Sequence, residues 1–452
     1  MENNNYKEAL TKIIPGGAHT YSRGDDQYPS NAPSILERGK GAYVWDPSGN
    51  RYLDYGMALR AVTLGYANER VNKAAFREIE KGVNLTRATT IELEAAQAMV
   101  DLIPSAEMVK FAKNGSNVTS AAVKIARAYT GRKFVCVPRQ QPFFSFDDWF
   151  IGTTPMKRGI PSEHYSTTLL FDYNDIGSLQ KLFDQYPNQI AAVMLEPATT
   201  IMPCNCGVVK SVSKICAACE NNASNFLHQV KNICQKNNTV FILDEMITGF
   251  RWHLNGAQTY FGVEPDLSTF GKGMANGFAV AALVGKKELM DLGSIYEEGA
   301  ERTFLISTTH GAEMSGMGAF LETVKIYREQ YVIEHLWKFG EKLFTGINDV
   351  SKSMGLQNYF YMDGGYVSMN YLTKDNDGNV SLPFRTLFAQ EMIKNGVLIP
   401  WIAPSFAHRD EELKLTLEAV DRSLQIYKKA LSEGINKYLK GRVIKPVFRQ
   451  FN

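Results

Sequence analysis

The sequence predicts an α/β fold in which helices cover a large, mainly parallel sheet. The main observation is an alternation between about Glu92 and Gly285, where segments with helical periodicity are separated by short, largely apolar runs. Strands of a parallel sheet are buried on both faces and are typically apolar throughout. A length of 452 residues allows two or three domains, and the 44% of hydrophobic and 21% of charged residues are typical of a globular protein. The apolar runs are VKFAK, FVCV, AAVMLE, VFILDE and AVAALVG.

The segments outside this alternation follow other patterns. From Glu37 to Asp54, Gly-rich turns separate short β-like pieces (AYVW and RYLDY), which favours small antiparallel strands. A helical stretch is expected from Met314 to Phe344, and an amphipathic helix from about Asp410 to Leu431. Between them, GGYVSMNYL and NVSLPF flank the turn sequence Asp375–Gly378, so we expect a β-hairpin there.

Charge and hydropathy exclude some classes of protein. The net charge is +2, with Lys and Arg spread along the chain, and this gives no electrostatic footprint for nucleic acid. The first residues, MENNNYKEALTK, lack the apolar core of a signal peptide. No apolar stretch approaches the ~20 residues that span a bilayer. We therefore expect a cytoplasmic protein without a nucleic-acid or membrane partner.

One aspartate and one lysine indicate the chemistry. The apolar run Val240 to Leu243 ends at Asp244, and Lys272 lies 28 residues further on, between two glycines. Ligands of open α/β sheets bind beyond the carboxyl ends of the strands. There, a lysine can form a Schiff base with pyridoxal phosphate (PLP), and an aspartate can keep the pyridine nitrogen protonated. Taken singly, such residues are more often a helix-capping Asp and a solvated Lys.

The sequence motifs around these two residues resemble those of a known family. DEMITGFR followed by PDLSTFGK is similar to the class III PLP-dependent aminotransferases, and most closely to their glutamate-1-semialdehyde aminomutase-like branch. Further pieces occur in the family's order along nearly the whole chain: IPGGAHTYSRGD, RGKGAYVWDPSGNRYLDYG, VKFAKNGSNVTSAAVKIARAYTGR, FDYND, MLEPA, STTHGAE, GVLIPW, SFAH and TLEAV.

The resemblance implies a fold type I PLP transferase with two domains. Residues 1–60 would be an N-terminal segment of a small α+β domain, which residues 326–452 complete. Residues 61–325 would form the large cofactor-binding domain, with a Cys-rich insertion at 203–222. The expected activity is transfer of an amino group between an amine and a carbonyl compound, by an aminotransferase or aminomutase.

A phosphate site is expected where LysAsnGlySerAsn leads into a helix. Ser116 and Asn117 would lie near the helix N-terminus, whose free N–H groups and dipole favour an anion. Gly115 would let the backbone approach the phosphate closely. Ser and Asn before a helix are also ordinary N-caps, so this pattern alone is not specific. The family more often has SerGlyThrGlu here, so this chain departs from it.

Further cofactor contacts follow from the resemblance. Phe143 and Phe144 take the places of the family's Tyr-His pair near the cofactor ring. A phenylalanine ring can stack on the cofactor but cannot assist proton transfer. The alternative is that these aromatic residues are part of the hydrophobic core, as most aromatic clusters are. Asn174 matches a residue near the phenolic oxygen of the cofactor. Glu196 ends the apolar run AAVML, again at a strand end. Met246 should pack under the ring, where its polarizable sulfur suits an aromatic face.

Two other matches concern assembly and substrate. Thr308, in STTHG, corresponds to the family threonine that reaches the phosphate from the neighbouring subunit, so the resemblance implies a homodimer with its active site at the interface. Arg23 falls where an arginine binds the substrate carboxylate, and its planar fork suits that task. Each residue, taken alone, is equally compatible with an ordinary solvated loop.

Four of the six cysteines crowd one short span that resembles an insertion in the family pattern. Cys204 and Cys206 form the first pair, and Cys216 and Cys219 the second. Four thiolates can hold a structural zinc ion in tetrahedral geometry, although the single residue within the first pair is shorter than usual spacings. Free thiols are the alternative, because disulfides are rare in a reducing cytoplasm.

Two alternatives to an aminotransferase or aminomutase stay open. The missing Tyr-His pair leaves room for another reaction on the same cofactor, such as decarboxylation or epimerisation. A non-catalytic scaffold with a zinc-containing insertion is the second alternative, and the presence of both Lys272 and Asp244 argues against it.

Overall fold

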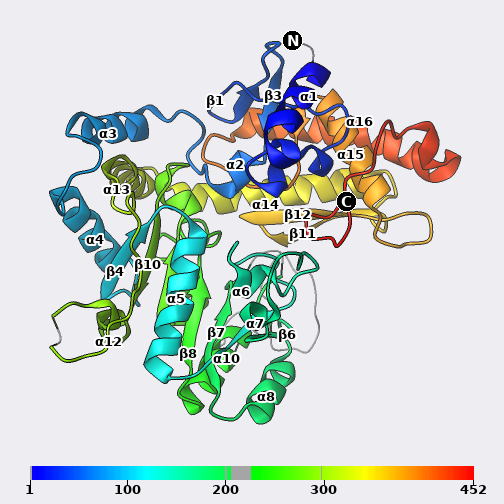
Figure 1. The fold of residues 1–452 in the computed structure, drawn as a ribbon. Helices are drawn as coiled ribbons and strands as arrows, with labels where there is room; N and C mark the ends of the chain where they lie inside the picture. Colours follow the sequence, from blue (N-terminus) through cyan, green and yellow to red (C-terminus); the bar gives the residue numbers. More distant parts are fainter. Residues whose placement is uncertain (1–2, 199–200, 205–224, 297) are drawn as a thin grey trace. The chain divides into compact units, whose positions relative to one another are not determined.

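The computed structural model describes residues 3–198, 201–204, 225–296 and 298–452. The chain divides into two compact units (Figure 1). The first unit combines Met1–Asn68 with Glu334–Arg449, and the second contains Glu69–Ile333 with Gln450–Asn452. The two terminal regions of the chain therefore fold together in one unit, and the middle of the chain forms the other.

The second unit is built on a seven-stranded sheet with the strand order β4-β10-β9-β8-β7-β5-β6. The five strands from β9 to β6 are parallel to their neighbours, whereas β10 is antiparallel to both β4 and β9. Strand β4 therefore runs in the same direction as the five. This confirms the predicted, mainly parallel sheet. The strands are β4 (Met108–Ala112), β5 (Phe134–Pro138), β6 (Thr168–Phe171), β7 (Ile190–Leu195), β8 (Val240–Asp244), β9 (Leu267–Phe270) and β10 (Ala281–Gly285).

Helix α5 (Gly115–Thr130) lies along one face of this sheet (Figure 1). Its small and branched apolar side chains pack in one core cluster with residues of β5, β7 and β8, which explains the helical spacing seen in the sequence. The side chain of Asn114 accepts a hydrogen bond from the backbone N–H of Asn117 and caps the helix. Gly131 ends it with a left-handed φ of 65°, which glycine adopts without strain.

The remaining helices of the second unit connect or flank the strands. They are α3 (Glu69–Glu80), α4 (Thr90–Leu102), α6 (Asp148–Ile151), α7 (Ser162–Tyr165), α8 (Ile176–Gln185), α10 (Phe226–Lys236), α11 (Ala257–Phe261), α12 (Lys287–Met290) and α13 (Met314–Glu329), with the 3-10 turns η4 (Lys272–Ala275) and η5 (Asp291–Gly293).

The first unit has a four-stranded sheet, a β-hairpin and three long helices around one apolar core. In the sheet, β1, β2 and β3 are antiparallel, as predicted for Glu37 to Asp54, and β13 pairs with β3 in parallel. The elements are α1 (Asn3–Ile13), η1 (Pro15–Gly17), η2 (Tyr21–Arg23), η3 (Asp25–Gln27), β1 (Arg38–Lys40), β2 (Tyr43–Trp45), β3 (Arg51–Asp54), α2 (Met57–Arg60), α14 (Val332–Ser353), β11 (Phe360–Gly365), β12 (Ser368–Thr373), α15 (Leu382–Lys394), β13 (Val397–Leu398), α16 (Asp410–Glu433) and η6 (Ile435–Lys437).

The predicted hairpin around Asp375–Gly378 has its turn, but its second strand is reduced to one antiparallel bridge, between Lys374 and Val380. The turn exists, since the N–H of Gly378 donates to the oxygen of Asp375 at 3.0 Å. However, β12 pairs with the preceding strand β11. The segment after the turn becomes helix α15, because Ser381 caps it by accepting from the N–H of Phe384 and a proline occupies its first turn.

The single helical stretch expected from Met314 to Phe344 is two helices. The break lies between Glu329 and Val332, where Tyr331 has a φ of 51° that an α-helix does not allow. The predicted C-terminal helix is confirmed as α16. Among the described residues, no helix combines the length and apolarity that crossing a membrane requires.

Candidate active site

Most of the predicted cofactor residues follow the carboxyl ends of the strands in the second unit. Lys272 follows β9, Asp244 ends β8, Glu196 follows β7, Phe143 follows β5 and Asn174 follows β6. The phosphate segment at the start of α5 follows β4. Because these six strands run in the same direction, their carboxyl ends share one edge of the sheet. The fold therefore gathers residues that lie far apart in the sequence.

Asp244 is a buried and firmly oriented carboxylate. It is 2% exposed, and its Oδ1 accepts hydrogen bonds from the Thr269 hydroxyl and the Met246 backbone N–H, both at 3.0 Å. Burial raises the pKa of Asp244 above its ordinary value, and the nearby charge of Lys272 acts in the opposite direction. A cationic partner therefore favours the ionised form of this carboxylate.

Lys272 begins the short turn η4 with an unusual backbone. Its φ is 42°, in the left-handed region that non-glycine residues rarely occupy, and Asn276 at the end of the turn has a φ of 47°. Such conformations cost of order 1–3 kcal/mol and cluster at functional sites. Strand β9 and this turn hold Lys272 where its charge acts on Asp244 of the adjacent strand β8.

Met246 packs tightly between two glycines of the same edge. A Cβ on Gly115 would lie 3.0 Å from the Met246 sulfur, and a Cβ on Gly271 would lie 2.7 Å from it. Both glycines therefore make room for this side chain, which is 8% exposed. For Gly115, the close neighbour in the structure is thus Met246, a contact that the sequence did not indicate.

The start of α5 carries the residues expected at the phosphate. Ser116 is 4% exposed, and its Oγ accepts from the N–H of Phe146 at 3.0 Å. The backbone N–H of Asn117 is taken by the Asn114 cap at 3.1 Å. A hydroxyl that accepts one bond can still donate its proton, so Ser116 suits an anion at this helix N-terminus.

The two phenylalanines at the predicted stacking position differ in burial. Phe144 is 2% exposed and packs edge-on against Phe150 inside the core, with the ring centroids 5.4 Å apart. Phe143 is 45% exposed, and its ring centroid lies 6.1 Å from that of Phe150. The hydroxyl of Thr119 donates to the carbonyl of Phe144 at 2.8 Å and fixes this segment on α5. Of the pair, Phe143 has the ring that is accessible for stacking.

Asn174 and Glu196 are held in place by amide hydrogen bonds. Asn174, with a φ of 66°, donates to the carbonyl of Met202 and accepts from the N–H of Cys204, both at 2.9 Å. Gln141 forms two 2.8 Å bonds with the backbone of Glu196. Glu196 itself is 4% exposed. The Asn174 amide therefore holds the backbone at Met202 and Cys204.

Thr308 lies on the surface of the second unit. Its backbone carbonyl accepts from the N–H of Gly311 at 3.1 Å, and its side chain is exposed. The following Glu313 caps α13 and accepts from the Lys113 ammonium at 2.5 Å. This ion pair ties the segment that carries Thr308 to the end of β4.

Arg23 belongs to the first unit, where it lines a cavity of about 660 Å³. Within the described part of the chain, its guanidinium makes no ion pair or hydrogen bond with another side chain, and the residue is exposed. Burial raises the pKa of the Tyr28 hydroxyl, as does Asp54, whereas the charge of Arg23 lowers it. Other polar or aromatic lining residues are His19, Asp25, Tyr66 and Trp401.

Of the predicted zinc ligands, only Cys204 belongs to the described residues, and it is buried. Cys206, Cys216 and Cys219 lie outside them. Across residues 3–198, 201–204, 225–296 and 298–452, no group of three or more His, Cys, Asp and Glu side chains is arranged to hold a metal ion.

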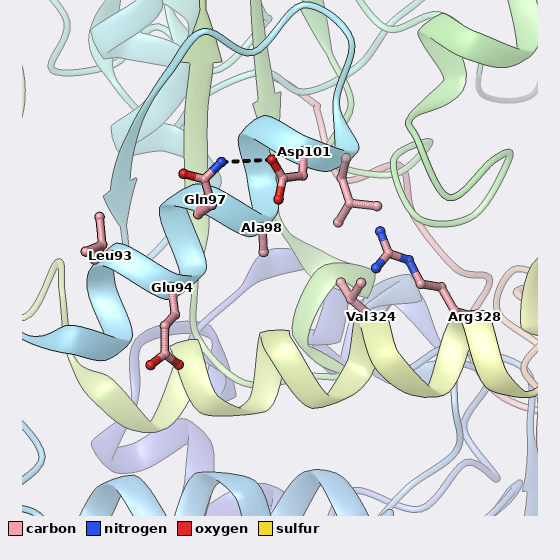
Figure 2. Close-up of a pocket in the computed structure, with 8 residues that line it drawn as sticks. Leu93, Glu94, Gln97, Ala98, Asp101, Val324 and Arg328 are labelled. Atoms are coloured by element: carbon pink, nitrogen blue, oxygen red, sulfur yellow. Dashed lines mark hydrogen bonds between the residues drawn. The ribbon is translucent and has the colours of Figure 1, made fainter.

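Another groove of the second unit lies between α4 and α13 (Figure 2). It has a volume of about 500 Å³, and Arg328 points toward it in the view of Figure 2. The side chain of Gln97 donates to Asp101 at 2.8 Å on its α4 wall. Its lining includes no predicted cofactor residue, so the candidate site stays at the strand ends. The lining residues are Leu93, Glu94, Gln97, Ala98, Asp101, Leu102, Val324 and Arg328.

Sequence reasoning missed two residues that orient the site, Thr269 and Gln141. Thr269 lies in the PDLSTFGK motif directly opposite Asp244 in the pairing of β8 with β9. Recognising LSTF as a strand would have revealed this contact. Gln141 carries no such signal, because its role depends on a backbone 55 residues away.

Comparisons with known proteins identify the family of this chain. The family model "Aminotransferase class-III" matches residues 25–431. Glutamate-1-semialdehyde 2,1-aminomutase of Archaeoglobus fulgidus is 32% identical, over 93% of this chain and 98% of that protein. The 3-aminobutyryl-CoA aminotransferase of Cloacimonas acidaminovorans is 29% identical, over 94% and 97%.

A solved structure of the FumI protein of Sphingopyxis sp. MTA144, in its PLP internal aldimine form, superposes with a TM-score of 0.83. That structure is 26% identical and covers 95% of this chain and 97% of its own. The fold is thus the fold type I architecture of these transaminases. The chain belongs to the class III aminotransferase family of aminotransferases and aminomutases.

Proposed function

We propose that this chain binds PLP at the shared strand edge and transfers an amino group between an amine and a carbonyl compound. The observation that supports this most is the placement of the buried Asp244 at the end of β8 and of Lys272 just after the adjacent strand β9, where the lysine charge acts on the carboxylate. When bound, PLP supplies an aldehyde for a Schiff base with an amine and a ring that accepts electrons.

The residues of the edge fit the three parts of this cofactor. The buried Asp244 suits a protonated pyridine nitrogen, because a cation there keeps the carboxylate ionised. Met246 and Phe143 suit the two ring faces. Ser116, with the backbone of Gly115 and Asn117, suits the phosphate. Asn174 and Glu196 complete the proposed set beside the ring.

We assign two roles to Lys272. Its amine would hold the aldehyde of the cofactor. The same amine, when free, would be the base beside the substrate carbon and would move the proton there. The strained turn η4 fixes the backbone of Lys272 and limits where that amine can reach.

We further propose that the substrate carries a carboxylate that Arg23 binds. Two observations support this role: the guanidinium makes no ion pair within the described residues, and it lines a cavity. By their names, two matched relatives act on glutamate-1-semialdehyde and on 3-aminobutyryl-CoA. Whether the amino group leaves this substrate or moves within it separates aminotransferase from aminomutase.

The test is a half-reaction with the purified holoenzyme. Candidate amines are added without an acceptor, and the conversion of the yellow PLP form to the colourless pyridoxamine form is followed by absorbance. Stoichiometric conversion supports amino transfer and identifies the donor. Release of carbon dioxide or racemisation of the donor without conversion would instead support decarboxylation or epimerisation. Borohydride reduction followed by peptide mapping should place the adduct on Lys272, and an adduct on another lysine would refute the assignment.

We propose a cytoplasmic homodimer in which Thr308 of one subunit reaches the phosphate bound by the other. The exposure of Thr308 on the second unit supports this arrangement. Exposed apolar side chains near it in sequence are also compatible with a covered face: Ile295, Tyr296 and Phe304 are 67%, 87% and 72% exposed.

We keep structural zinc at Cys204, Cys206, Cys216 and Cys219 as a separate proposal, supported by the number and spacing of the thiols. The polar segment around them has few apolar residues, so metal ligation would supply its ordering free energy. Metal analysis of the purified protein is the test. Less than about half an equivalent of zinc, with all four thiols titrating freely, would leave ordinary reduced cysteines.

A further inference from the structure

The chain continues beyond the region that matches the family. The match ends at residue 431, and residues 438–449 form a segment without helix or strand, here called the C-terminal strap, that follows η6 in the first unit. The same match begins at residue 25, so Arg23 also lies just outside it. The structure brings these two flanking regions together.

The strap is anchored on helix α15 by two buried side chains. Gln390, which is 1% exposed, accepts from the N–H of Lys440 at 2.7 Å and donates to the carbonyl of Tyr438 at 3.1 Å. Thr386, which is fully buried, accepts from the N–H of Ile444 at 3.0 Å. Buried side chains that pair with a backbone define its path closely. The strap is therefore a fixed element.

From this anchor, the strap binds the turns that follow Arg23. Arg442 pairs with the carboxylate of Asp25, and its guanidinium also donates to the Asp25 backbone carbonyl. Arg449 pairs with Asp26 at 2.6 Å. The N–H of Lys445 donates to the Asp26 carbonyl at 2.9 Å.

Further contacts reinforce the same junction. The side chain of Gln27 donates to the carbonyl of Lys445 at 3.0 Å, and the N–H of Arg442 donates to the Ser30 hydroxyl at 3.3 Å. Asp25 also pairs with Lys7 of α1 at 2.7 Å. The carboxylates of Asp25 and Asp26 are only about a third exposed, so these pairs are partly shielded from solvent.

Besides the strap, the turns are held by their own backbone bonds and by the Lys7–Asp25 pair. Neither η2, which ends at Arg23, nor η3, which begins at Asp25, contains a buried residue. A segment without buried apolar contacts opens readily unless polar contacts restrain it. Arg23 and Asp25 both line the 660 Å³ cavity of this unit. The strap contacts, together with the Lys7–Asp25 pair, therefore restrain this wall of the cavity.

We infer that Arg442 and Arg449 are positioning residues that hold Arg23 where it binds the substrate carboxylate. This inference rests on the carboxylate-binding role proposed for Arg23. A guanidinium must meet both carboxylate oxygens in one plane, so small displacements of its backbone weaken the pairing. The strap thus tunes substrate affinity through a segment outside the family match.

The test uses the full-length holoenzyme with the double substitution Arg442→Gln/Arg449→Gln. Amide hydrogen exchange over residues 18–30 should accelerate at least about tenfold, since the restraint on these turns is lost. KM for a carboxylate-bearing amino donor should rise about tenfold, with kcat changed by less than about twofold. KM for an amine without a carboxylate should not change. Cofactor absorbance serves to show that the variant is folded.

The matched control is Lys437→Gln/Lys440→Gln, which removes two positive charges from the same part of the chain. The Lys437 ammonium pairs with Glu433, and that of Lys440 donates to the Lys437 carbonyl, so neither side chain holds the turns near Arg23. The control should match wild type in exchange and in KM. Arg442→Lys/Arg449→Lys should recover part of the lost affinity.

Arg23→Gln separates the inference from the proposed function. If it raises KM for the carboxylate donor and the strap variant leaves exchange or KM at wild-type values, the strap has no positioning role. If Arg23→Gln itself leaves KM unchanged, the carboxylate role of Arg23 fails, and the inference fails with it. A strap variant whose KM rises equally for amines with and without a carboxylate would also overturn it.

Discussion

The sulfur of Met246 lies 2.7 Å from the position that a Cβ on Gly271 would occupy. Gly271 has an extended φ of 179°, which any residue can adopt, so the requirement for glycine is steric. Real Cβ atoms do not approach a sulfur this closely. The residue before the proposed Schiff-base lysine is thus matched to the residue proposed to lie under the cofactor ring.

We predict that Gly271→Ala displaces Met246 and weakens cofactor binding. The added methyl must push the Met246 side chain along the strand edge, which costs roughly 1–3 kcal/mol in a packed site. Cofactor affinity, measured by PLP titration, should fall about tenfold for each 1.4 kcal/mol that the displacement costs. Met246→Ala in the Gly271→Ala background should recover part of the affinity. No recovery would show that the glycine matters for another reason.

Asp244→Asn should slow the chemistry far more than it weakens cofactor binding. The amide cannot stabilise a protonated ring nitrogen, so kcat should fall at least about a hundredfold, as when a charge-stabilising group is removed from an active site. Thr269→Val should show a smaller effect of about tenfold, because it removes only the 3.0 Å bond that orients the carboxylate. Single-turnover absorbance measurements report the chemical step separately from cofactor binding. Near-normal kcat in Asp244→Asn would refute the role.

The sequence predicted most of the strand edge because its signals are local. An apolar run followed by Asp244 gives both a buried strand and a residue at its end, and the structure has β8 there with Asp244 2% exposed. The same logic placed Glu196 after β7. The gathering of these residues follows from parallel strand direction, which the alternation of helices and strands already implied.

What the sequence did not predict depends on contacts between distant segments. LSTF is too short and polar to stand out, so β9 and the Thr269 bond to Asp244 were missed. NVSLPF has β-like residues, but Ser381 caps a helix there and helix formation prevails. The strap pairs Asp25 with Arg442 across most of the chain, and no local pattern reports such a pair.

Glu245 makes stability depend on pH in a defined direction. Burial raises the pKa of Glu245 to about 7 although it accepts bonds from Gln258 and the N–H of Ala257. Because the pKa of Glu245 is higher in the folded state, its contribution to the stability of the fold is complete at pH values below its ordinary, unfolded-state pKa. That contribution is lost as the pH rises through about 7. The wild-type free energy of unfolding, relative to Glu245→Gln, should therefore fall by up to about 3 kcal/mol between pH 4 and 8.

Urea denaturation at a series of pH values measures this difference. Glu313→Gln provides a control of opposite sign. Although partial burial acts to raise it, the Lys113 ammonium holds the pKa of Glu313 below its usual range. The stabilisation from Glu313 is therefore present at pH values above its ordinary, unfolded-state pKa. It is lost as the pH falls through its lower, folded-state pKa. A difference between wild type and Glu245→Gln that stays constant from pH 4 to 8 would contradict the prediction for Glu245.

The proposed role of Thr308 predicts complementation between two defective chains. As homodimers, Lys272→Ala should be inactive, and Thr308→Ala should bind PLP about tenfold more weakly through loss of a bond to a charged phosphate. If Thr308 acts on the neighbouring subunit, a mixed dimer of the two variants contains one site with both residues intact. That site should show wild-type cofactor affinity and about half the wild-type turnover per dimer, as expected for an isologous interface.

Co-expression with two different affinity tags, followed by sequential purification, isolates the mixed dimer. The apparent PLP affinity of the mixed dimer shows whether Thr308 acts on the neighbouring subunit or on its own. Turnover alone does not distinguish the two arrangements. If Thr308 instead served its own subunit, the only site with Lys272 would lack the threonine, and the mixed dimer would bind PLP as weakly as the Thr308→Ala homodimer. Ser307→Ala, at the exposed residue next to Thr308, is the matched control and should not alter the affinity.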